Sequence, residues 1–337
     1  MKTLFIGLGS IGQRHLNNLF MLLGKDVEVF AYRKTHHNRV FVDGESREVK
    51  SLQEYYNYIP VDSFYDGLDK NPEAVFITNP SSEHINMMIP AAEKGCHIFV
   101  EKPLSNSMEG VDKIESLTES KGLSVMVGFQ TRFNPCYKIV NKILRQNKFG
   151  KVVSAHFEWG TYLPSHHPYE DYRQSYAARK DLGGGVVLGL MHELDMICSF
   201  WGQPQNISVI GGRLGLFEID VEDTVSVLME YRKENYSFPV SLFLSYAQTK
   251  ENRWFRIQFE KATLFCNLTE SNLRIFGQLG EMIEEYIFHD FQRNTLFVEE
   301  LKEFITAIKD RRDPQVTLYD GVESLKLALK IKANINE

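Results

Sequence analysis

The 337-residue sequence has no long hydrophobic run. Its first ten residues, MKTLFIGLGS, contain one lysine and a short apolar run that stops at a glycine. A secretory leader needs a longer apolar core and a small-residue cleavage site. No apolar stretch approaches the roughly 20 residues that span a bilayer. We therefore expect neither a leader nor a membrane partner.

The sequence also has few cysteines and no excess of positive charge. The cysteines, which are Cys96, Cys136, Cys198 and Cys266, are scattered without paired spacing. This is typical of reduced thiols in a cytoplasmic protein. The formal net charge is −6, whereas nucleic-acid-binding proteins usually carry a basic face. We therefore expect no nucleic-acid partner. The adjacent histidines His166 and His167 have no series of further metal ligands near them in the sequence, so we expect no metal site.

What is present in the N-terminal part is an alternation of short apolar runs and helical patterns. Apolar runs at residues 2–6, 27–31, 74–78, 97–100 and 124–127 have the composition of buried parallel strands. Helical patterns separate them, for example at residues 107–120. The alternation predicts an α/β domain over residues 1–128 with a doubly wound parallel sheet of the Rossmann type.

The pattern changes after Gly128. Long alternating segments between residues 151 and 268 predict a large, mostly antiparallel sheet with one open face. We expect one apolar helix from the triple glycine at residues 183–185 to about Phe200. Two final helices are expected at residues 294–309 and 318–332. Together these segments predict a C-terminal α+β domain over residues 129–337.

A glycine-rich turn follows the first predicted strand. Gly7, Gly9 and Gly12, with Ser10 and Ile11 between the last two, match the G-x-G-x-x-G pattern. The first glycine permits a tight turn, the second lets the backbone approach a pyrophosphate, and the third allows a helix to pack closely on the strand. The pattern stands directly after a strand and opens a helix, which is the context that a dinucleotide-binding site requires.

The end of the second predicted strand lacks the carboxylate that usually holds the ribose 2′-hydroxyl of NAD. Arg33 and Lys34 stand there instead. A guanidinium pairs well with a phosphate, and its planar face can stack on adenine. This favours NADP over NAD as the cofactor, while a solvated turn is the alternative interpretation of the two cations.

Three further stretches, taken with the glycine turn, resemble the Gfo/Idh/MocA family of oxidoreductases. They are Glu101-Lys102-Pro103, the segment GFQTRFNP at residues 128–135, and the triple glycine followed by His192-Glu193-Leu194-Asp195. The segment at residues 167–185 is also similar to a subgroup that is often encoded near surface-polysaccharide or nucleotide-sugar pathways. The resemblance covers essentially the whole chain.

The resemblance implies hydride transfer between NAD(P) and a hydroxyl-bearing or keto carbon of a sugar, cyclitol or nucleotide sugar. It places Lys102 beside the nicotinamide and the substrate hydroxyl, and it makes His192 the acid/base. The expected cofactor-binding residues are Gly7, Gly9, Ser10, Ile11, Gly12, Arg33, Lys34, Asn79, Pro80, Glu101 and Lys102. The expected substrate-binding residues are Lys102, Arg132, Tyr162, His167, Tyr172, Arg179 and His192. The family also pairs open sheet faces, so we expect a homodimer or homotetramer.

The chemistry agrees with this assignment, with one departure. Alcohol oxidation removes a hydride and a proton, and a histidine can take the proton near neutral pH while a lysine can stabilise an alkoxide. Many family members carry Asp four residues before the histidine, where this chain has Leu188. Asp195 is the residue that could orient His192 instead. Two alternatives stay open: a non-catalytic NAD(P)-binding sensor or structural protein, and a reductase of a C=N or C=C bond.

Overall fold

The computed structural model describes residues 1–35, 37–42 and 45–335, and its chain divides into two compact units. The first unit comprises Met1–Gln130 and Asn294–Leu325, and the second comprises Thr131–Arg293 and Lys326–Glu337. The expected division into 1–128 and 129–337 did not include the return of residues 294–325 to the first unit. That return buries Phe304 edge-on against Phe76 and Phe99, and it pairs Thr317 with Met126 in a β-bridge.

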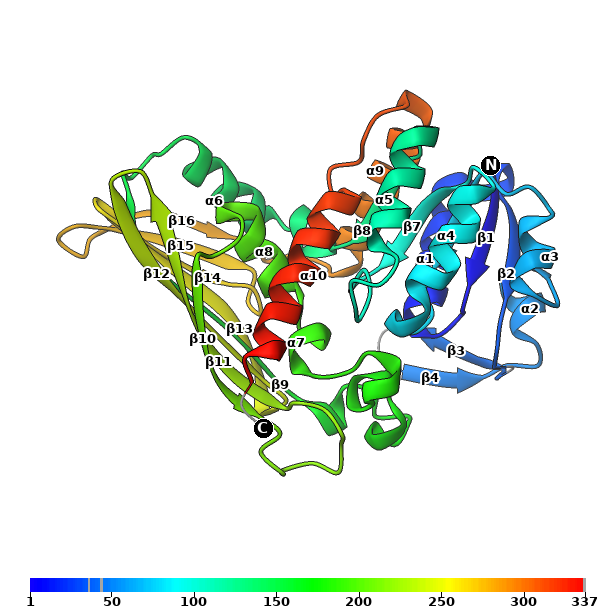
Figure 1. Ribbon diagram of the computed structural model, residues 1–337, viewed down its shortest axis with the longest axis horizontal. Helices are drawn as coiled ribbons and strands as arrows, with labels where there is room; N and C mark the ends of the chain where they lie inside the picture. The colour runs from blue at the N-terminus through cyan, green and yellow to red at the C-terminus, as the bar shows by residue number, and fades with distance from the viewer. Residues whose placement is uncertain (36, 43–44, 336–337) are drawn as a thin grey trace. The chain divides into compact units, whose positions relative to one another are not determined.

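The described part of the first unit holds a six-stranded sheet in which all neighbouring strands are parallel (Figure 1). Its strands are β1 (Lys2–Ile6), β2 (Glu28–Tyr32), β5 (Ile59–Pro60), β6 (Ala74–Ile77), β7 (His97–Glu101) and β8 (Val125–Gly128). They lie in the order β5-β2-β1-β6-β7-β8. This is the strand order of the dinucleotide-binding Rossmann fold, which confirms the predicted fold class of this part.

Helices cover both faces of the parallel sheet, as its buried strands require. On one face, α1 (Ser10–Leu23) packs beside α9 (Asn294–Asp310), next to the rings of Phe5, Phe76 and Phe99. Elsewhere, α4 (His84–Glu93) packs on α5 (Val111–Lys121) and on β6 and β7. The helices α2 (Leu52–Tyr56) and α3 (Phe64–Leu68) and the hairpin of β3 (Arg39–Val42) and β4 (Glu45–Glu48) complete the unit.

The second unit contains, among its described residues, an eight-stranded sheet. In spatial order the strands are β10 (Asn206–Gly212), β11 (Thr224–Lys233), β12 (Tyr236–Ser245), β9 (Val152–Tyr162), β13 (Ala247–Phe259), β14 (Ala262–Asn267), β15 (Asn272–Gly277) and β16 (Met282–Ile287). All neighbours are antiparallel except β12 and β9. Val227 and Met229 of β11 are buried, whereas Leu228 between them is 54% exposed. The predicted, mostly antiparallel sheet is therefore confirmed.

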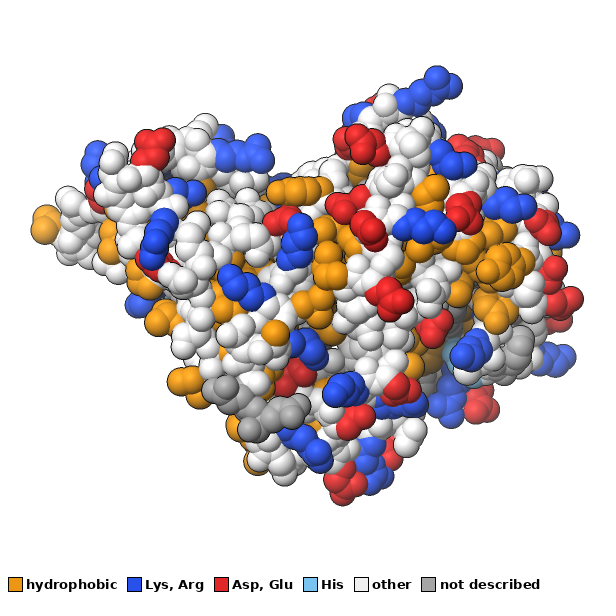
Figure 2. Space-filling view, in the orientation of Figure 1, with side chains coloured by type: hydrophobic (Ala, Val, Ile, Leu, Met, Phe, Trp, Pro, Cys, Tyr) orange, Lys and Arg blue, Asp and Glu red, His pale blue; other side chains and the backbone are white. Residues whose placement is uncertain are grey.

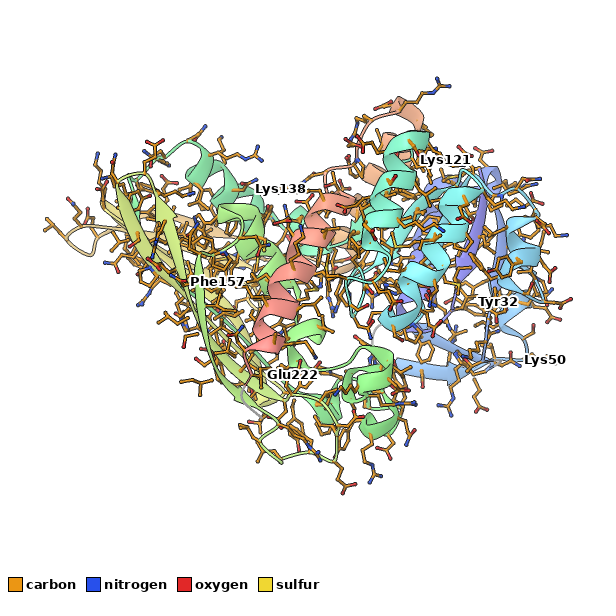
Figure 3. All side chains as sticks on the ribbon, in the orientation of Figure 1. Tyr32, Lys50, Lys121, Lys138, Phe157 and Glu222 are labelled. Carbon is orange, nitrogen blue, oxygen red and sulfur yellow. The ribbon has the colours of Figure 1, made fainter. Side chains whose placement is uncertain are left out.

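The helices α6 (Pro135–Arg145), α7 (Val186–Gly189) and α8 (His192–Trp201) also belong to the second unit, and α10 (Leu318–Ala333) contributes its last turns. Lys332 of α10 bonds both carboxylate oxygens of Glu222, at 3.0 and 2.9 Å (Figure 3). Phe157 of β9, labelled in the same figure, is fully buried, and its ring stacks on Phe255. These contacts fix the end of α10 and one layer of the sheet.

The prediction of one continuous helix after the triple glycine is wrong. The axes of residues 180–189 and 192–201 differ by 57°, because Leu190 leaves helical geometry with a ψ of 38°. Tyr246 fills the space beside the bend: its hydroxyl donates to the Gly185 carbonyl at 3.0 Å and occupies the position that a side chain at residue 189 would take. Leu188 and His192 consequently lie on different helices and do not share a helical face.

Within the described residues, no single helix has the length and apolarity to cross a bilayer, and the bent pair just mentioned is the one candidate by those two criteria. On the face drawn in Figure 2, acidic and basic side chains are interspersed over the surface. Cys96, Cys136 and Cys266 are buried free thiols, and Cys198 is half-buried.

Candidate functional site

The glycine turn has the three geometries that the sequence pattern requires. Gly7 has a φ of +89°, a left-handed conformation that favours glycine. A Cβ at Gly12 would lie 2.6 Å from both the Gly7 carbonyl oxygen and Thr78 Oγ1, so only a hydrogen fits between helix α1 and the strand ends. A Cβ at Gly9 would meet no atom within 4 Å. Gly9 therefore faces open space at the start of a helix, where a phosphate can approach.

The neighbouring strand end adds a polar group to this space. Ser10 and Ile11 are the first residues of α1, whose free N–H groups and positive dipole end favour a bound anion. Asn79 and Pro80 follow β6, which is the strand next to β1. Asn79 Oδ1 is buried and has no hydrogen-bond partner among the described residues. These features fit a dinucleotide, whose pyrophosphate would lie over Gly9 and whose polar groups could satisfy Asn79.

Arg33 stands directly after β2, next to Tyr32 at the strand end labelled in Figure 3. Its Nη1 donates to the Tyr58 hydroxyl at 3.0 Å, and its Nη2 donates to the His37 carbonyl. Arg33 is half-buried, whereas Lys34 is exposed. The Arg33 side chain is thus held in place at the strand end, while Lys34 faces solvent.

Glu101 and Lys102 lie at the carboxyl end of β7. Glu101 is 7% exposed; its Oε1 lies 2.6 Å from His15 Nε2, and its Oε2 accepts from the Lys102 backbone N–H at 3.1 Å. A Cβ at Gly128 would approach the Glu101 carboxylate to 3.2 Å, so the glycine leaves room for it. The carboxylate thereby anchors the backbone from which the Lys102 side chain extends.

A second carboxyl group is buried in the same unit. Glu300 of α9 is 0% exposed, and neither of its oxygens has a hydrogen-bond partner within the described part of the chain. Burial raises the pKa of Glu300 well above its ordinary value, and the charge of Glu101 adds to the rise. Burial therefore favours the protonated form of Glu300, whereas Glu101 is the residue whose carboxyl group contacts His15.

In the second unit, His192 is the first residue of α8 and is 2% exposed. Its ring lies 6.0 Å from that of Trp159 on β9. The Arg253 guanidinium covers the Trp159 ring at 4.0 Å, and its Nε donates to Glu193 Oε1 at 2.6 Å. The start of α8 is thus tied to the sheet through a stacked cation and a buried ion pair.

Arg132 and Asp195 form a second buried ion pair in this unit. Arg132 Nε and Nη2 donate to the two carboxylate oxygens of Asp195 at 2.6 and 2.8 Å, and Nη1 donates to the Tyr137 hydroxyl at 3.2 Å. Arg132 is 7% and Asp195 0% exposed. The expectations that Arg132 binds substrate and that Asp195 orients His192 remain predictions. The bidentate contact shows what both side chains do in the fold, which is to anchor α8.

The other expected substrate residues lie at the end of β9, where Tyr162 stands, and in the segment that follows at residues 163–185. Tyr162 and Tyr172 both pack against Phe217, with ring centroids 5.9 and 6.0 Å away. His167 Nδ1 lies 2.6 Å from the Tyr169 hydroxyl, and burial lowers the pKa of His167. Arg179, in contrast, is paired with its exposed neighbour Asp181, with Nη2 donating at 2.6 Å. The structure groups the two tyrosines, keeps His167 close to Tyr169, and holds Arg179 in a surface ion pair.

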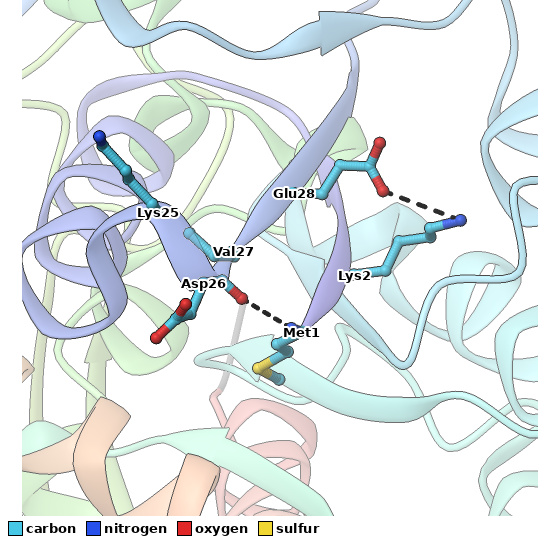
Figure 4. Close-up of a pocket in the computed structure, with 6 residues that line it drawn as sticks. All are labelled: Met1, Lys2, Lys25, Asp26, Val27 and Glu28. Atoms are coloured by element: carbon cyan, nitrogen blue, oxygen red, sulfur yellow. Dashed lines mark hydrogen bonds and ion pairs between the residues drawn. The ribbon is translucent and has the colours of Figure 1, made fainter.

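A surface hollow lies at the other end of the parallel sheet. Its volume is about 230 Å³, and Met1, Lys2, Lys25, Asp26, Val27 and Glu28 line it (Figure 4). The Met1 amino group donates to the Asp26 carbonyl at 2.7 Å, and Lys2 pairs with Glu28 at 3.8 Å. Because these residues begin β1 and β2, the hollow is remote from the glycine turn. The described residues contain no group of three or more His, Cys, Asp or Glu side chains placed to hold a metal ion.

Comparison with known proteins gives the family. Residues 1–129 match the model of an oxidoreductase family with an NAD-binding Rossmann fold, and residues 137–265 match the model of the Gfo/Idh/MocA C-terminal domain. The chain belongs to the Gfo/Idh/MocA family. This confirms the resemblance drawn from the motifs, the oxidoreductase function and the nicotinamide cofactor.

One curated relative and several solved structures match this Gfo/Idh/MocA protein over nearly their whole length. Myo-inositol 2-dehydrogenase of Thermotoga maritima is 26% identical over 345 residues, which cover 100% of this chain and 97% of the relative. The structure of UDP-N-acetylglucosamine 3-dehydrogenase of Acidithiobacillus ferrooxidans is 19% identical, with a TM-score of 0.77 over 99% of this chain and 97% of that one. Levoglucosan dehydrogenase in complex with NADH and levoglucosan is 17% identical, with a TM-score of 0.81 over 99% and 96%. The two structures show a shared fold.

Several residues of the site were not predicted from the sequence. His15, Trp159, Arg253 and Glu300 lie on helices or strands with ordinary amphipathic patterns, in which a buried polar residue is not marked. Alternation along β9 does put Trp159 on the same face as the buried Phe157, so the pattern could have assigned it to the inner face. The ion pairs could not be found, because each joins segments far apart in the sequence.

Proposed function

We propose that the protein is an NADP(H)-preferring dehydrogenase that acts on a secondary hydroxyl group of a sugar, cyclitol or nucleotide sugar. The observation that carries the proposal is the strand-end geometry of the first unit: open space at Gly9, the orphaned Asn79 Oδ1, and Lys102 directly after β7. The full-length relative named for myo-inositol oxidation supports a polyhydroxyl substrate.

Oxidation of the hydroxyl group breaks one C–H bond, whose hydrogen leaves as hydride, and one O–H bond, whose hydrogen leaves as a proton. The nicotinamide supplies the hydride acceptor when oxidised and the hydride donor when reduced. The hydroxyl proton goes to a side chain of this chain, and we assign that task to Lys102 and His192. Glu101 holds the Lys102 backbone N–H at 3.1 Å, and the Arg253–Glu193 ion pair holds the helix start that carries His192. Both groups are therefore presented from fixed backbone.

The preference for NADP(H) rests on Arg33. Its guanidinium is already held at the end of β2, the position that contacts the ribose in this fold. A charge-assisted bond to the 2′-phosphate contributes about 1.5–3 kcal/mol, so Arg33→Ala should weaken NADPH binding by roughly 10- to 150-fold. NADH, which lacks the 2′-phosphate, serves as the matched control for the same variant.

A fluorescence titration with NADPH and NADH comes first. Tighter binding of NADPH that disappears in Arg33→Ala supports the cofactor preference, and tighter binding of NADH refutes it. Binding of neither would refute the oxidoreductase proposal and bring forward a role without turnover.

Substrates are then screened with the bound cofactor. The panel contains myo-inositol, levoglucosan and UDP-N-acetylglucosamine, with Lys102→Ala, His192→Ala and the double variant as partners. If both residues handle the same proton, the double variant should lose little more kcat than the worse single variant. Full additivity would show that they act in separate steps, and unchanged turnover in Lys102→Ala would refute its assignment.

The proposal includes self-association and a cytoplasmic location. On the outer face of the second unit's sheet, Ile210 is 77% and Leu228 54% exposed, and a monomer would leave these side chains in water. The buried or half-buried free thiols suit a reducing compartment. Sedimentation velocity at micromolar concentration should show a dimer or tetramer, and a single monomer boundary would contradict it.

A further inference from the structure

His84 occupies an unusual position in the first unit, between two loops of the proposed cofactor site. It is the first residue of α4, and its side chain is 1% exposed. Nδ1 lies 2.9 Å from the carbonyl oxygen of Pro103, and Nε2 lies 2.9 Å from that of Asn79. One imidazole ring thus contacts two backbone carbonyls that are 24 residues apart in the sequence.

These two carbonyls belong to the ends of adjacent strands. Asn79 follows β6 and Pro103 follows β7, and the two strands pair in parallel through Ile77 and Val100. Ligands of this fold bind outside the carboxyl ends of such strands. Lys102 directly precedes Pro103, so a contact to the Pro103 carbonyl acts on the peptide unit next to Lys102.

The ring can bond a carbonyl of either loop only through a hydrogen bond that it donates. A carbonyl oxygen accepts and never donates, so each such bond requires a proton on the facing nitrogen. The neutral ring has one N–H and the imidazolium has two. Burial lowers the pKa of His84, while the backbone contacts to Asn79, Pro103 and Leu104 and the charge of Glu101 act in the opposite direction. The neutral ring donates to one of the two carbonyls and stays packed against the other. An apolar side chain of the same size could fill the space but could satisfy neither carbonyl.

We propose that His84 is a positioning residue that joins the Asn79 loop to the Pro103 loop and thereby fixes Lys102 against the cofactor. It touches neither the reacting atoms nor the cofactor in this role. The inference rests on the proposed function for its effect on turnover, while the joining of the two loops is measurable without a substrate.

The test compares His84→Ala and His84→Gln with His97→Ala. His97 lies at the other end of β7, is half-buried, and accepts a backbone hydrogen bond from Ser124 at 3.0 Å. It therefore controls for the loss of a structural histidine elsewhere in the same unit. Hydrogen–deuterium exchange is measured on peptides that cover residues 79–82 and 102–106. We expect exchange in both peptides to rise by roughly tenfold in His84→Ala, because local opening becomes easier when a buried hydrogen bond is lost. His97→Ala should leave both unchanged.

Turnover and cofactor binding are measured in the same variants, below their melting transitions. Misplacement by about 1 Å can cost on the order of 10²-fold in rate, so His84→Ala should lower kcat by about 10- to 100-fold with a smaller change in KM. The side-chain amide of His84→Gln can donate a hydrogen bond, so this variant should restore part of the exchange protection and part of kcat. It also replaces His84→Ala if the latter does not fold.

The outcomes separate this inference from the proposed function. Faster exchange in both loops of His84→Ala, together with no turnover in the wild-type protein, would support the joining role and refute the proposed dehydrogenase activity. Unchanged exchange in His84→Ala, or a kcat within twofold of that of His97→Ala, would overturn the inference even if Lys102→Ala is inactive.

Discussion

The buried carboxyl group of Glu300 makes the stability of the protein depend on pH in a direction that can be worked out. Its pKa in the folded state is raised by burial and by the charge of Glu101, whereas in the unfolded chain it is that of an ordinary glutamate. Between these two pKa values the folded state holds one proton that the unfolded state has lost. The free energy of unfolding therefore falls as pH rises through this window, by up to about 1.4 kcal/mol per pH unit.

Glu300→Gln removes the titrating group and keeps the shape of the side chain. The amide leaves an uncharged polar group buried, so its cost does not vary with pH in this range. Between pH 5.5 and 7.5 the variant should gain up to about 2.7 kcal/mol relative to the wild type. For a domain of this size, 1 kcal/mol corresponds to a change in Tm of about 2–4 °C. The expected gain in Tm is thus several degrees, in favour of the variant at the higher pH.

The assay is a series of calorimetric melts of the two proteins over this pH range. Glu299→Gln is the matched control, because Glu299 is the adjacent residue on the same helix and is only half-buried, with a surface contact to Lys302. The difference in Tm between Glu299→Gln and the wild type should stay constant with pH. A constant Tm difference between Glu300→Gln and the wild type would refute the reasoning, since it would mean that Glu300 has the same proton occupancy in both states.

Three further predictions follow from particular contacts. Gly9→Ala should keep the wild-type Tm and lose cofactor affinity by at least tenfold in a fluorescence titration. Gly12→Ala should instead lower the Tm, because its Cβ would meet a backbone oxygen at 2.6 Å. Equal changes of Tm and affinity in the two variants would contradict the assigned roles. Asp195→Asn should lower the free energy of unfolding by about 3–5 kcal/mol, because it leaves the charge of Arg132 buried without its partner. The joint replacement Arg132→Met with Asp195→Leu should recover most of this loss in urea melts. An unrecovered loss would show that the pair does more than anchor α8. Tyr246→Phe should cost about 0.5–1.5 kcal/mol by the same measurement, because it loses its hydrogen bond to the Gly185 carbonyl, which keeps the bond from the Gly189 N–H. A neutral result would contradict a stabilising role for the Tyr246 bond.

Much of the first unit could be predicted because its signals are local. The alternation of apolar runs and helical patterns gave five of the parallel strands to within one residue but missed the two-residue strand β5. The three glycines each have the geometry that their spacing predicts. The hairpin at residues 39–48 was not predicted, because Glu45, Arg47 and Glu48 leave no alternating apolar face. The strands at residues 272–277 and 282–287 were also missed, since the second of them carries few buried side chains.

The helix before His192 shows why a periodic pattern can mislead. The run VVLGLMHELDMICSF is apolar at helical spacing, and nothing in it marks a break. The break comes from Tyr246, which lies between β12 and β13 and far away in the sequence. Its hydroxyl takes the place of a side chain at residue 189 and bonds the Gly185 carbonyl. A tertiary contact overrides local propensity here, and the four-residue spacing from Leu188 to His192 loses its meaning as a helical turn.

The buried polar residues near the strand ends extend the same argument from fold to function. A buried polar group costs stability unless a hydrogen-bond partner offsets its burial. Glu300, His84 and Glu101 are three such groups near the strand ends. Glu101 has such partners in His15 and the Lys102 N–H, and His84 has two carbonyls, but Glu300 has none among the described residues. The groups with partners are those that fix the backbone on either side of Lys102. If that fixation serves turnover, removing Glu300 should change stability alone, while removing His84 should change kcat more than the free energy of unfolding.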